Sequence, residues 1–180
     1  IESFLRFYKL TNKKVVAHFN EWMTAFGELY LKHNMPQMAT VFTTHATSIG
    51  RSIAGNHKPL YDYLHAYNGD QMASELNMQS KHSVEKQAAH NADCFTTVSN
   101  VTAKECKQLL EKAPDVVTPN GFENDFVPKA RMFSKKRNEA RAALRRVAEK
   151  MLGYKLSDDV MFIGTSGRYE FKNKGIDVFI

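Results

Sequence analysis

The stretch "MATVFTT" (38–44) decides the fold, because it is a short run of apolar and β-branched residues that follows a break at "NMPQ" (34–37). A run of this kind without strict alternation is typical of a strand in a parallel sheet whose two faces are both covered. The segment "HATSIGR" (45–51) follows at once and carries an imidazole and a guanidinium. Ligands of open parallel sheets bind beyond the carboxyl ends of the strands, so polar chemistry is expected here.

Similar strands are predicted on both sides of this one, and each is followed by a helical pattern. The strands are expected within "VVAH" (15–18), "DCFTTVS" (93–99) and "PDVV" (114–117). The helices are expected over "EWMTAFGELYLKH" (21–33), "SVEKQAAHNA" (83–92) and "NVTAKECKQLLEK" (100–112). Strands that alternate with helices of this length indicate β-α units, so the predicted class is α/β with a parallel sheet and flanking helices.

Two details of these helices are predicted from residue type. The apolar residues Trp22, Phe26, Leu29 and Tyr30 recur at helical spacing, so they are expected on the inner face of the first helix. Ser83 is expected to cap the start of the second helix, with an acidic residue in its first turn.

The positive charge of the chain is concentrated in one predicted helix. The net charge is +6. The segment "RMFSKKRNEARAALRRVAEKM" (131–151) holds eight Lys or Arg and two Glu, and the remainder is neutral. An apolar stripe favours a helix that packs on one side and is solvated on the other; it consists of Phe133, Ala140, Leu144, Val147 and Met151. The alternative is a module that binds nucleic acid through this helix.

Composition places the chain among globular proteins, with 43% hydrophobic and 24% charged residues. No apolar run approaches the roughly 20 residues of a membrane span, and "IESFLRFYKL" (1–10) does not have the pattern of a secretion signal. Cys94 and Cys106 lack the spacing of a zinc site or a disulfide framework, so both are expected to be buried thiols of a cytosolic protein. The missing initial Met fits a piece of a longer chain.

The last segment, "VMFIGTSGRYEFKNKGIDVFI" (160–180), predicts a strand, a basic turn and the start of a helix. Arg168 presents a planar fork that suits phosphate oxygens, and Lys174 stands at the expected helix start. Gly167 and Gly175 allow the backbone to approach a ligand closely. The alternative is a solvated turn whose charges have no ligand.

Two further groups of residues suit a ligand, and each has a structural alternative. His45 and Arg51 lie six residues apart, so an imidazole can face a substrate while a guanidinium faces an anion; otherwise His45 is a core histidine and Arg51 a surface charge. Glu21 and Trp22 together suit a sugar, although a single Trp on an apolar helix face is more often core. His18, Glu21 and His45 also leave open a two-His, one-carboxylate metal site.

Five motifs in one order resemble the glycogen synthases of the animal, fungal and related bacterial type. They are "VVAHFNEW", "VFTTHATSIGR", "AAHNADCFTTVS", "VTPNGF" and "GRYEFKNKG", and the match runs from about Val15 to the last residue. The resemblance implies a retaining glycosyltransferase with two Rossmann-like domains that face each other, the GT-B architecture. It predicts the end of the N-terminal domain over 1–128, a basic helical connection over 129–155, and the first strand, turn and helix of the C-terminal domain over 156–180.

The resemblance also assigns roles to residues. It implies transfer of glucose from UDP-glucose to the 4-hydroxyl end of an α-1,4-glucan, with neither metal nor other cofactor. It places His45 and Glu21 in the catalytic centre, and it gives the donor phosphates to Arg51, Arg168 and Lys174. It puts His18 and Trp22 on the acceptor side and Asn120 and Gly121 beside the inter-domain cleft.

This sequence departs from the family at two places. Many members have His-Phe-His-Glu-Trp where this chain has Asn20 between Phe19 and Glu21, and Asn20 cannot titrate. The segment 52–80 is unlike the eukaryotic forms. The full-length protein is expected to be cytoplasmic and homo-oligomeric, without nucleic-acid or membrane partners. The isolated chain is expected to be inactive, and a sucrose- or trehalose-phosphate-type synthase is the alternative enzyme.

Overall fold

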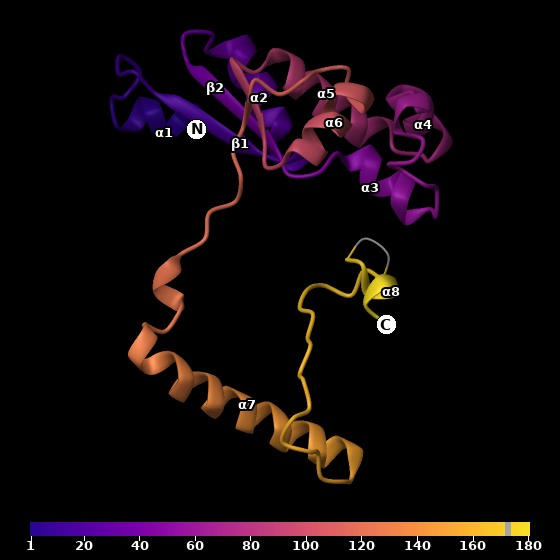
Figure 1. The fold of residues 1–180 in the computed structure, drawn as a ribbon. Coiled ribbons are helices and arrows are strands. Elements are labelled where there is room, and N and C mark those ends of the chain that lie inside the picture. Colours follow the sequence, from indigo (N-terminus) through magenta and orange to yellow (C-terminus); the bar gives the residue numbers. More distant parts are fainter. Residues whose placement is uncertain (172–173) are drawn as a thin grey trace. The chain divides into compact units, whose positions relative to one another are not determined.

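The computed structural model describes residues 1–171 and 174–180, which form two compact units, Ile1–Asn120 and Gly121–Ile180 (Figure 1). The division falls in the expected "TPNG" turn, whereas the predicted domain boundary is at 128. None of the helices in the described part of the chain is both long enough and apolar enough to cross a membrane. Each unit is described separately.

The first unit is built on a four-stranded parallel sheet, which confirms the predicted α/β class. Its strands follow the order of the chain: β1 (Val16–Asn20), β2 (Ala39–Thr44), β3 (Cys94–Thr97) and β4 (Val116–Val117). In the register of the sheet Phe19 pairs with Phe42 and Phe42 with Phe95. Six α-helices and a 3-10 turn accompany the strands: α1 (Glu2–Phe7), α2 (Trp22–Asn34), α3 (Ser48–Gly55), η1 (Leu64–Ala66), α4 (Gly69–Glu75), α5 (Gln79–Asn91) and α6 (Asn100–Leu109).

Helices α2, α5 and α6 pack on a single face of the sheet, whereas α3 and α4 pack against α5 and α6. The main core joins Phe19, Phe42 and Phe95 to buried residues of α2, α5 and α6, and the rings of Phe42 and Phe95 stack with centroids 5.9 Å apart. On the other face Val16 and Val116 stay exposed, and no helix of the described residues covers them. Parallel connections are right-handed, so strands added in one direction place every helix on one side. The prediction that both faces are covered is therefore wrong for this chain.

The inner face of α2 also differs from the prediction. Ala25, Glu28 and Leu31 are buried, whereas Phe26 and Tyr30 are 66% and 52% exposed. The small Ala25 allows the helix to lie close to the sheet, and the Thr40 hydroxyl donates to Glu28 Oε1 over 3.3 Å. A search for large apolar residues misses such a face, because its members are small or polar.

Other predictions about single residues have mixed outcomes. Helix α5 begins at Gln79, so Ser83 lies inside the helix and does not cap it. Cys106 is buried as expected, whereas Cys94 is only partly buried. Burial raises the pKa of the Cys106 thiol, which agrees with an unreactive core residue.

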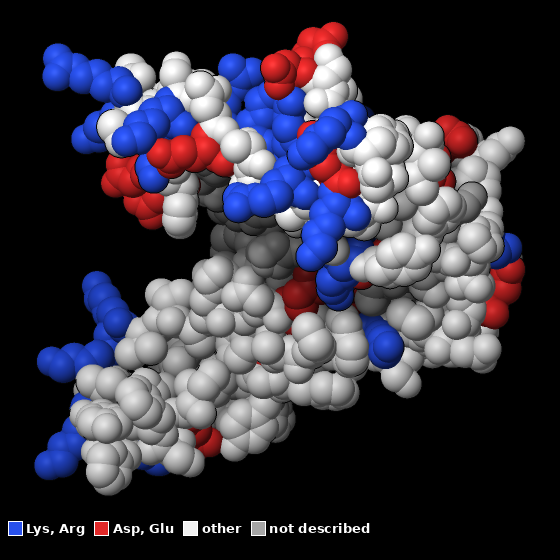
Figure 2. Space-filling view, turned by 90° about the horizontal axis from the view of Figure 1, so that it is seen from below, with Lys and Arg blue, Asp and Glu red and all other residues white. Residues whose placement is uncertain are grey.

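The second unit contains η2 (Asn124–Phe126), α7 (Ala130–Leu152) and α8 (Ile176–Phe179). The expected basic helix is confirmed as α7. Figure 2 shows one face of the molecule, on which Lys and Arg side chains (blue) gather with Asp and Glu side chains (red) among them. None of the residues of α7 is buried, so its apolar stripe does not pack as predicted within this unit. Gly153 ends the helix in the left-handed conformation, with φ 78°.

The strand expected at 160–163 is not formed. A strand requires a neighbour, and no residue in the described part of the chain pairs with this segment. Its backbone is instead held by α7, because the Arg141 guanidinium donates to the carbonyls of Asp158 and Val160 over 2.7 and 2.5 Å. Arg145 adds a bond to the Leu156 carbonyl at 3.1 Å. Two of the eight basic residues of α7 thus have a structural role.

We predict that Glu28 lowers the stability of the fold as the pH rises. Burial raises its pKa from 4.5 to about 7, so between these values the folded state holds a proton that the unfolded state has released. The contribution of Glu28 to the free energy of unfolding is therefore largest below about pH 4.5 and falls by about 2–3 kcal/mol toward pH 7. The variant Glu28→Gln cannot titrate and should lose this part of the pH dependence.

Urea unfolding of both proteins between about pH 5 and pH 7.5 measures this difference. The free energy of unfolding of Glu28→Gln, minus that of wild type, should increase as the pH rises. Glu139→Gln removes an exposed carboxylate of α7 as the matched control, and its gap to wild type should stay constant. A gap for Glu28→Gln that is equally constant would contradict the assignment of a raised pKa.

Candidate functional site

The candidate site begins at Glu21, directly after β1. Its backbone has φ 66° and ψ 159°, a region that residues other than glycine occupy at a cost of about 1–3 kcal/mol. The N–H of Glu21 donates to the Thr43 carbonyl over 2.8 Å, which joins the ends of β1 and β2. Strain of this kind is concentrated at functional sites, so it marks Glu21 as a candidate independently of any motif.

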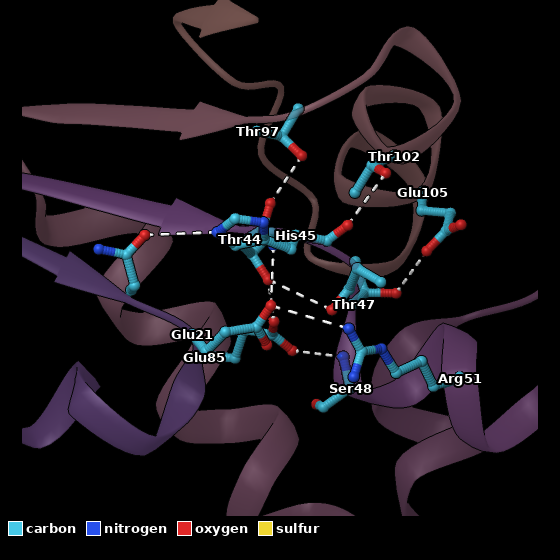
Figure 3. Close-up of polar contacts among 12 residues, drawn as sticks. Glu21, Thr44, His45, Thr47, Ser48, Arg51, Glu85, Thr97, Thr102 and Glu105 are labelled. Atoms are coloured by element: carbon cyan, nitrogen blue, oxygen red, sulfur yellow. Dashed lines mark hydrogen bonds and ion pairs between the residues drawn. The ribbon is translucent and has the colours of Figure 1, made fainter. Parts of the chain in front are cut away.

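Glu21 is connected directly to His45, which follows β2. The backbone N–H of His45 donates to Glu21 Oε1 over 3.0 Å (Figure 3). The His45 side chain is exposed, and its Nε2 lies 3.4 Å from Asn20 Oδ1. Asn20, the residue that departs from the family, therefore contacts the imidazole. The two residues predicted as catalytic thus lie together at one edge of the sheet.

Arg51 joins the same group from helix α3. Its Nη2 lies 3.8 Å from Glu21 Oε1, and its side chain is 47% exposed. Thr47 caps α3 by accepting a hydrogen bond from the Gly50 N–H over 3.0 Å. The sequence places Arg51 one turn further on, so the guanidinium points back to the carboxyl ends of the strands. Glu21, His45 and Arg51 are therefore one cluster.

Two buried carboxylates support the loop that carries His45. Glu85 of α5 accepts from the Thr44 hydroxyl at 2.5 Å and from the Ser48 N–H at 2.8 Å. Glu105 of α6 accepts from the Thr47 hydroxyl at 2.9 Å. Burial raises the pKa of Glu85, while its bonds to Thr44 and Ser48 act in the opposite direction. Sequence motifs do not identify either glutamate. Each lies in an amphipathic helix, where a glutamate is normally expected on the solvent-exposed face.

Glu105 has a second hydrogen-bond partner. The Tyr61 hydroxyl donates to Glu105 Oε1 over 2.8 Å, and burial followed by this hydrogen bond raises the pKa of Tyr61 to about 12. The paired threonines that end β2 and β3 are the feature of the sequence from which this polar layer, the hydrogen-bonded groups that support the 44–48 loop, could have been predicted. In both strands "FTT" precedes the loop, and the Thr97 hydroxyl donates to the Thr44 carbonyl over 2.7 Å.

His18 and Trp22 lie near the cluster but have partners of their own. His18 Nε2 is 2.7 Å from Thr43 Oγ1, on the face of the sheet that carries no helix. Trp22 is the first residue of α2, and the Lys81 ammonium lies 5.1 Å from the centroid of its ring. Within the described residues no group of three or more His, Cys, Asp or Glu is arranged for a metal ion. The alternative metal site is therefore not formed.

The other predicted residues belong to the second unit or to its border. Arg168 is exposed and pairs with Glu170 Oε1 at 3.0 Å. Lys174 is exposed and precedes Gly175, which has φ 65°. Helix α8 has only four residues, so its N-terminus is too short to form an anion site of its own. Asn120 ends the first unit and Gly121 begins the second, and both are exposed.

The fold and the cluster define the class of protein: a Rossmann-like α/β unit with a polar site at the carboxyl ends of its parallel strands. A family model described as glycogen synthase matches residues 1–180. The chain belongs to the glycogen synthase family.

Curated relatives support this assignment. The chain is 34% identical over 173 residues to the glycogen [starch] synthase of Dictyostelium discoideum. This match covers 94% of the chain and 20% of that protein. It is 33% identical over 174 residues to the glycogen [starch] synthase of Neurospora crassa, and 34% identical over 171 residues to the liver glycogen [starch] synthase of Homo sapiens. Each of these two matches covers 93% of the chain and 24% of the relative. The chain thus spans about a fifth to a quarter of these proteins.

We predict that Gly50→Ala disrupts the support of the loop. An added Cβ would lie 2.4 Å from Thr47 Oγ1 and 2.7 Å from Glu105 Oε2, so one of the two hydrogen-bonded groups must move. The free energy of unfolding should fall by about 1–3 kcal/mol. Gly164→Ala is the control, because nothing lies within 4 Å of its added Cβ. Urea unfolding measures both, and equal small effects would refute the close packing at Gly50.

Proposed function

We propose that the full-length protein transfers glucose from UDP-glucose to the 4-hydroxyl end of an α-1,4-glucan, with retention at the anomeric carbon. The observation that carries the proposal is the cluster of Glu21, His45 and Arg51 at the carboxyl ends of the strands in a chain of the glycogen synthase family. The names of the relatives favour a glucan acceptor over the phosphorylated sugars of a sucrose- or trehalose-phosphate-type enzyme.

The first unit supplies the sugar side of the proposed reaction. His45 is exposed and held through its backbone, so its imidazole can face the transferred glucose. Glu21 stabilises positive charge on the sugar ring and also orients the His45 backbone. Since the bond to UDP loosens before the acceptor arrives from the same face, catalysis depends chiefly on positioning and electrostatics.

The second unit supplies cations for the leaving group. In the proposal Arg168 and Lys174 bind the UDP diphosphate, and Arg51 reaches it from the first unit. The ion pair of Arg168 with Glu170 is exposed, so exchange of Glu170 for a diphosphate costs little. A guanidinium binds phosphate oxygens with two parallel hydrogen bonds, which favours it over a single ammonium. In the proposal, cationic side chains therefore neutralise the negative charge of the diphosphate.

The remaining assignments extend the proposal to the whole protein. His18 and Trp22 belong to the acceptor side, and Asn120 and Gly121 lie beside an inter-domain cleft. The basic helix α7 connects the two domains and does not serve to bind nucleic acid.

The protein is cytoplasmic and homo-oligomeric, and it acts without a metal or other cofactor. The isolated chain is inactive, because it contains little of the second wall of the donor site.

We predict that Arg168→Ala and Lys174→Ala each weaken UDP binding in the full-length protein and lower turnover by roughly 10²-fold or more, the effect of losing one donor to a developing anion. Isothermal titration with UDP and a glucosyl-transfer assay on glycogen measure the two effects. Arg6→Ala is the matched control, since Arg6 is a similarly exposed arginine that pairs with Glu2 at 2.7 Å. Its affinity and turnover should stay at wild-type values.

The same assay separates the acceptor classes. Wild-type protein should transfer glucose to glycogen and not to glucose 6-phosphate or fructose 6-phosphate. Preference for a sugar phosphate would overturn the proposed acceptor, whereas unchanged kinetics in both variants would remove the phosphate contacts from the proposal.

A further inference from the structure

The loop 44–48, which carries His45, is held at both ends by one side chain. Glu85 accepts from the Thr44 hydroxyl with one oxygen and from the Ser48 N–H with the other, so its carboxylate bridges the residues before and after His45 (Figure 3). Glu85 comes from α5, about 40 residues further along the chain, and its side chain is fully buried. A buried carboxylate with both oxygens bonded is a rigid constraint on its partners.

Other bonds hold this loop, but each reaches one position only. The Thr97 hydroxyl donates to the Thr44 carbonyl at 2.7 Å, and the Thr102 hydroxyl to the His45 carbonyl at 3.4 Å. Glu85 is the described side chain that reaches both flanks of His45. It also accepts the hydrogen bond of the Ser48 N–H in the first turn of α3, so this amide already has a partner within the protein.

We propose that Glu85 is a positioning residue, which fixes the 44–48 loop so that the His45 imidazole stays over the carboxyl end of β2. The hydrogen-bond partners of the buried Glu85 side chain are Thr44 and Ser48, and it acts on His45 through them. The inference rests on the proposed function for its effect on turnover. A displacement of about 1 Å in a catalytic group can lower the rate 10²-fold. The gain in rate from holding His45 in place can therefore outweigh the free-energy cost of burying the Glu85 side chain.

The chain contains a matched control for this proposal. Glu28 is a second fully buried glutamate of the same unit, on α2, and it accepts a hydrogen bond from Thr40 without a bond to the 44–48 loop. Loss of either side chain leaves a cavity in the core and removes a hydrogen bond to a threonine. Only the loss of Glu85 releases the loop.

The experiment compares Glu85→Ala, Glu85→Gln and Glu28→Ala in the full-length protein. In Glu85→Ala, kcat for glucosyl transfer should fall by roughly 10²-fold while the KM for UDP-glucose changes by less than about threefold, because the cations that bind the diphosphate are untouched. Glu85→Gln should stay within about tenfold of wild type, since its amide can accept from Ser48 N–H and donate to Thr44 Oγ1. Glu28→Ala should lose stability and keep its kcat.

A double-mutant cycle tests whether Glu85 acts through His45. Once His45→Ala has removed the imidazole, the further change Glu85→Ala should lower kcat by less than about threefold. If kcat of the double variant falls by the product of the two single-variant factors, Glu85 acts independently of His45 and the proposal is overturned. A Glu28→Ala variant that loses as much kcat as Glu85→Ala would also overturn it.

Amide hydrogen exchange tests the constraint without any activity. Protection of the Ser48 N–H should fall by at least about tenfold in Glu85→Ala and stay unchanged in Glu28→Ala. If Glu85→Ala does not fold, Thr44→Val removes one of the two bonds and should lower kcat by about tenfold without a change in KM. A wild-type protein that transfers no glucose would defeat the proposed function alone, whereas unchanged protection of Ser48 would defeat the positioning role.

Discussion

The right-handed connection between parallel strands is the constraint on which the first unit depends. Four strands follow one another across the sheet in chain order, so each connection turns the same way, and α2, α5 and α6 lie on the same face. The same rule brings the carboxyl ends of all strands to one edge. Glu21 after β1 and His45 after β2 are neighbours there, although 24 residues separate them in the chain. The site is thus a consequence of topology before any side chain is chosen.

The loops at that edge leave backbone groups that no strand or helix can satisfy. Glu85 satisfies one of them by accepting from the Ser48 N–H. Glu105 acts indirectly, because it accepts from the hydroxyl of Thr47, the residue that caps α3. Burial of a carboxylate is costly unless each oxygen is hydrogen-bonded. Both oxygens of Glu85 and of Glu105 have such partners. The polar layer therefore favours one geometry of the loop over its alternatives, which matters more here than its net stability.

The sequence predicts the elements of this fold better than it predicts their inner faces. The strands and α7 follow from runs and charge patterns that depend on neighbouring residues alone. The buried glutamates Glu28, Glu85 and Glu105 do not, because a carboxylate in a helix is normally solvated and its buried partner lies far along the chain. The expected strand at 160–163 fails for a related reason: strand formation requires a neighbour, and in the described residues the arginines of α7 bind that backbone instead. Local patterns report propensity, whereas these features depend on tertiary partners.

The two contacts of Glu21 differ in strength, and this difference suits the proposed reaction. Its oxygen receives the His45 N–H at 3.0 Å in a strained turn, whereas Arg51 lies 3.8 Å away and is half exposed. A pair of the second kind contributes little free energy, so a diphosphate can draw Arg51 away from Glu21 at low cost. The hydrogen bond that orients His45 joins its backbone N–H to Glu21 and does not include Arg51. Donor binding and the placement of the imidazole can therefore use one carboxylate without competing for it.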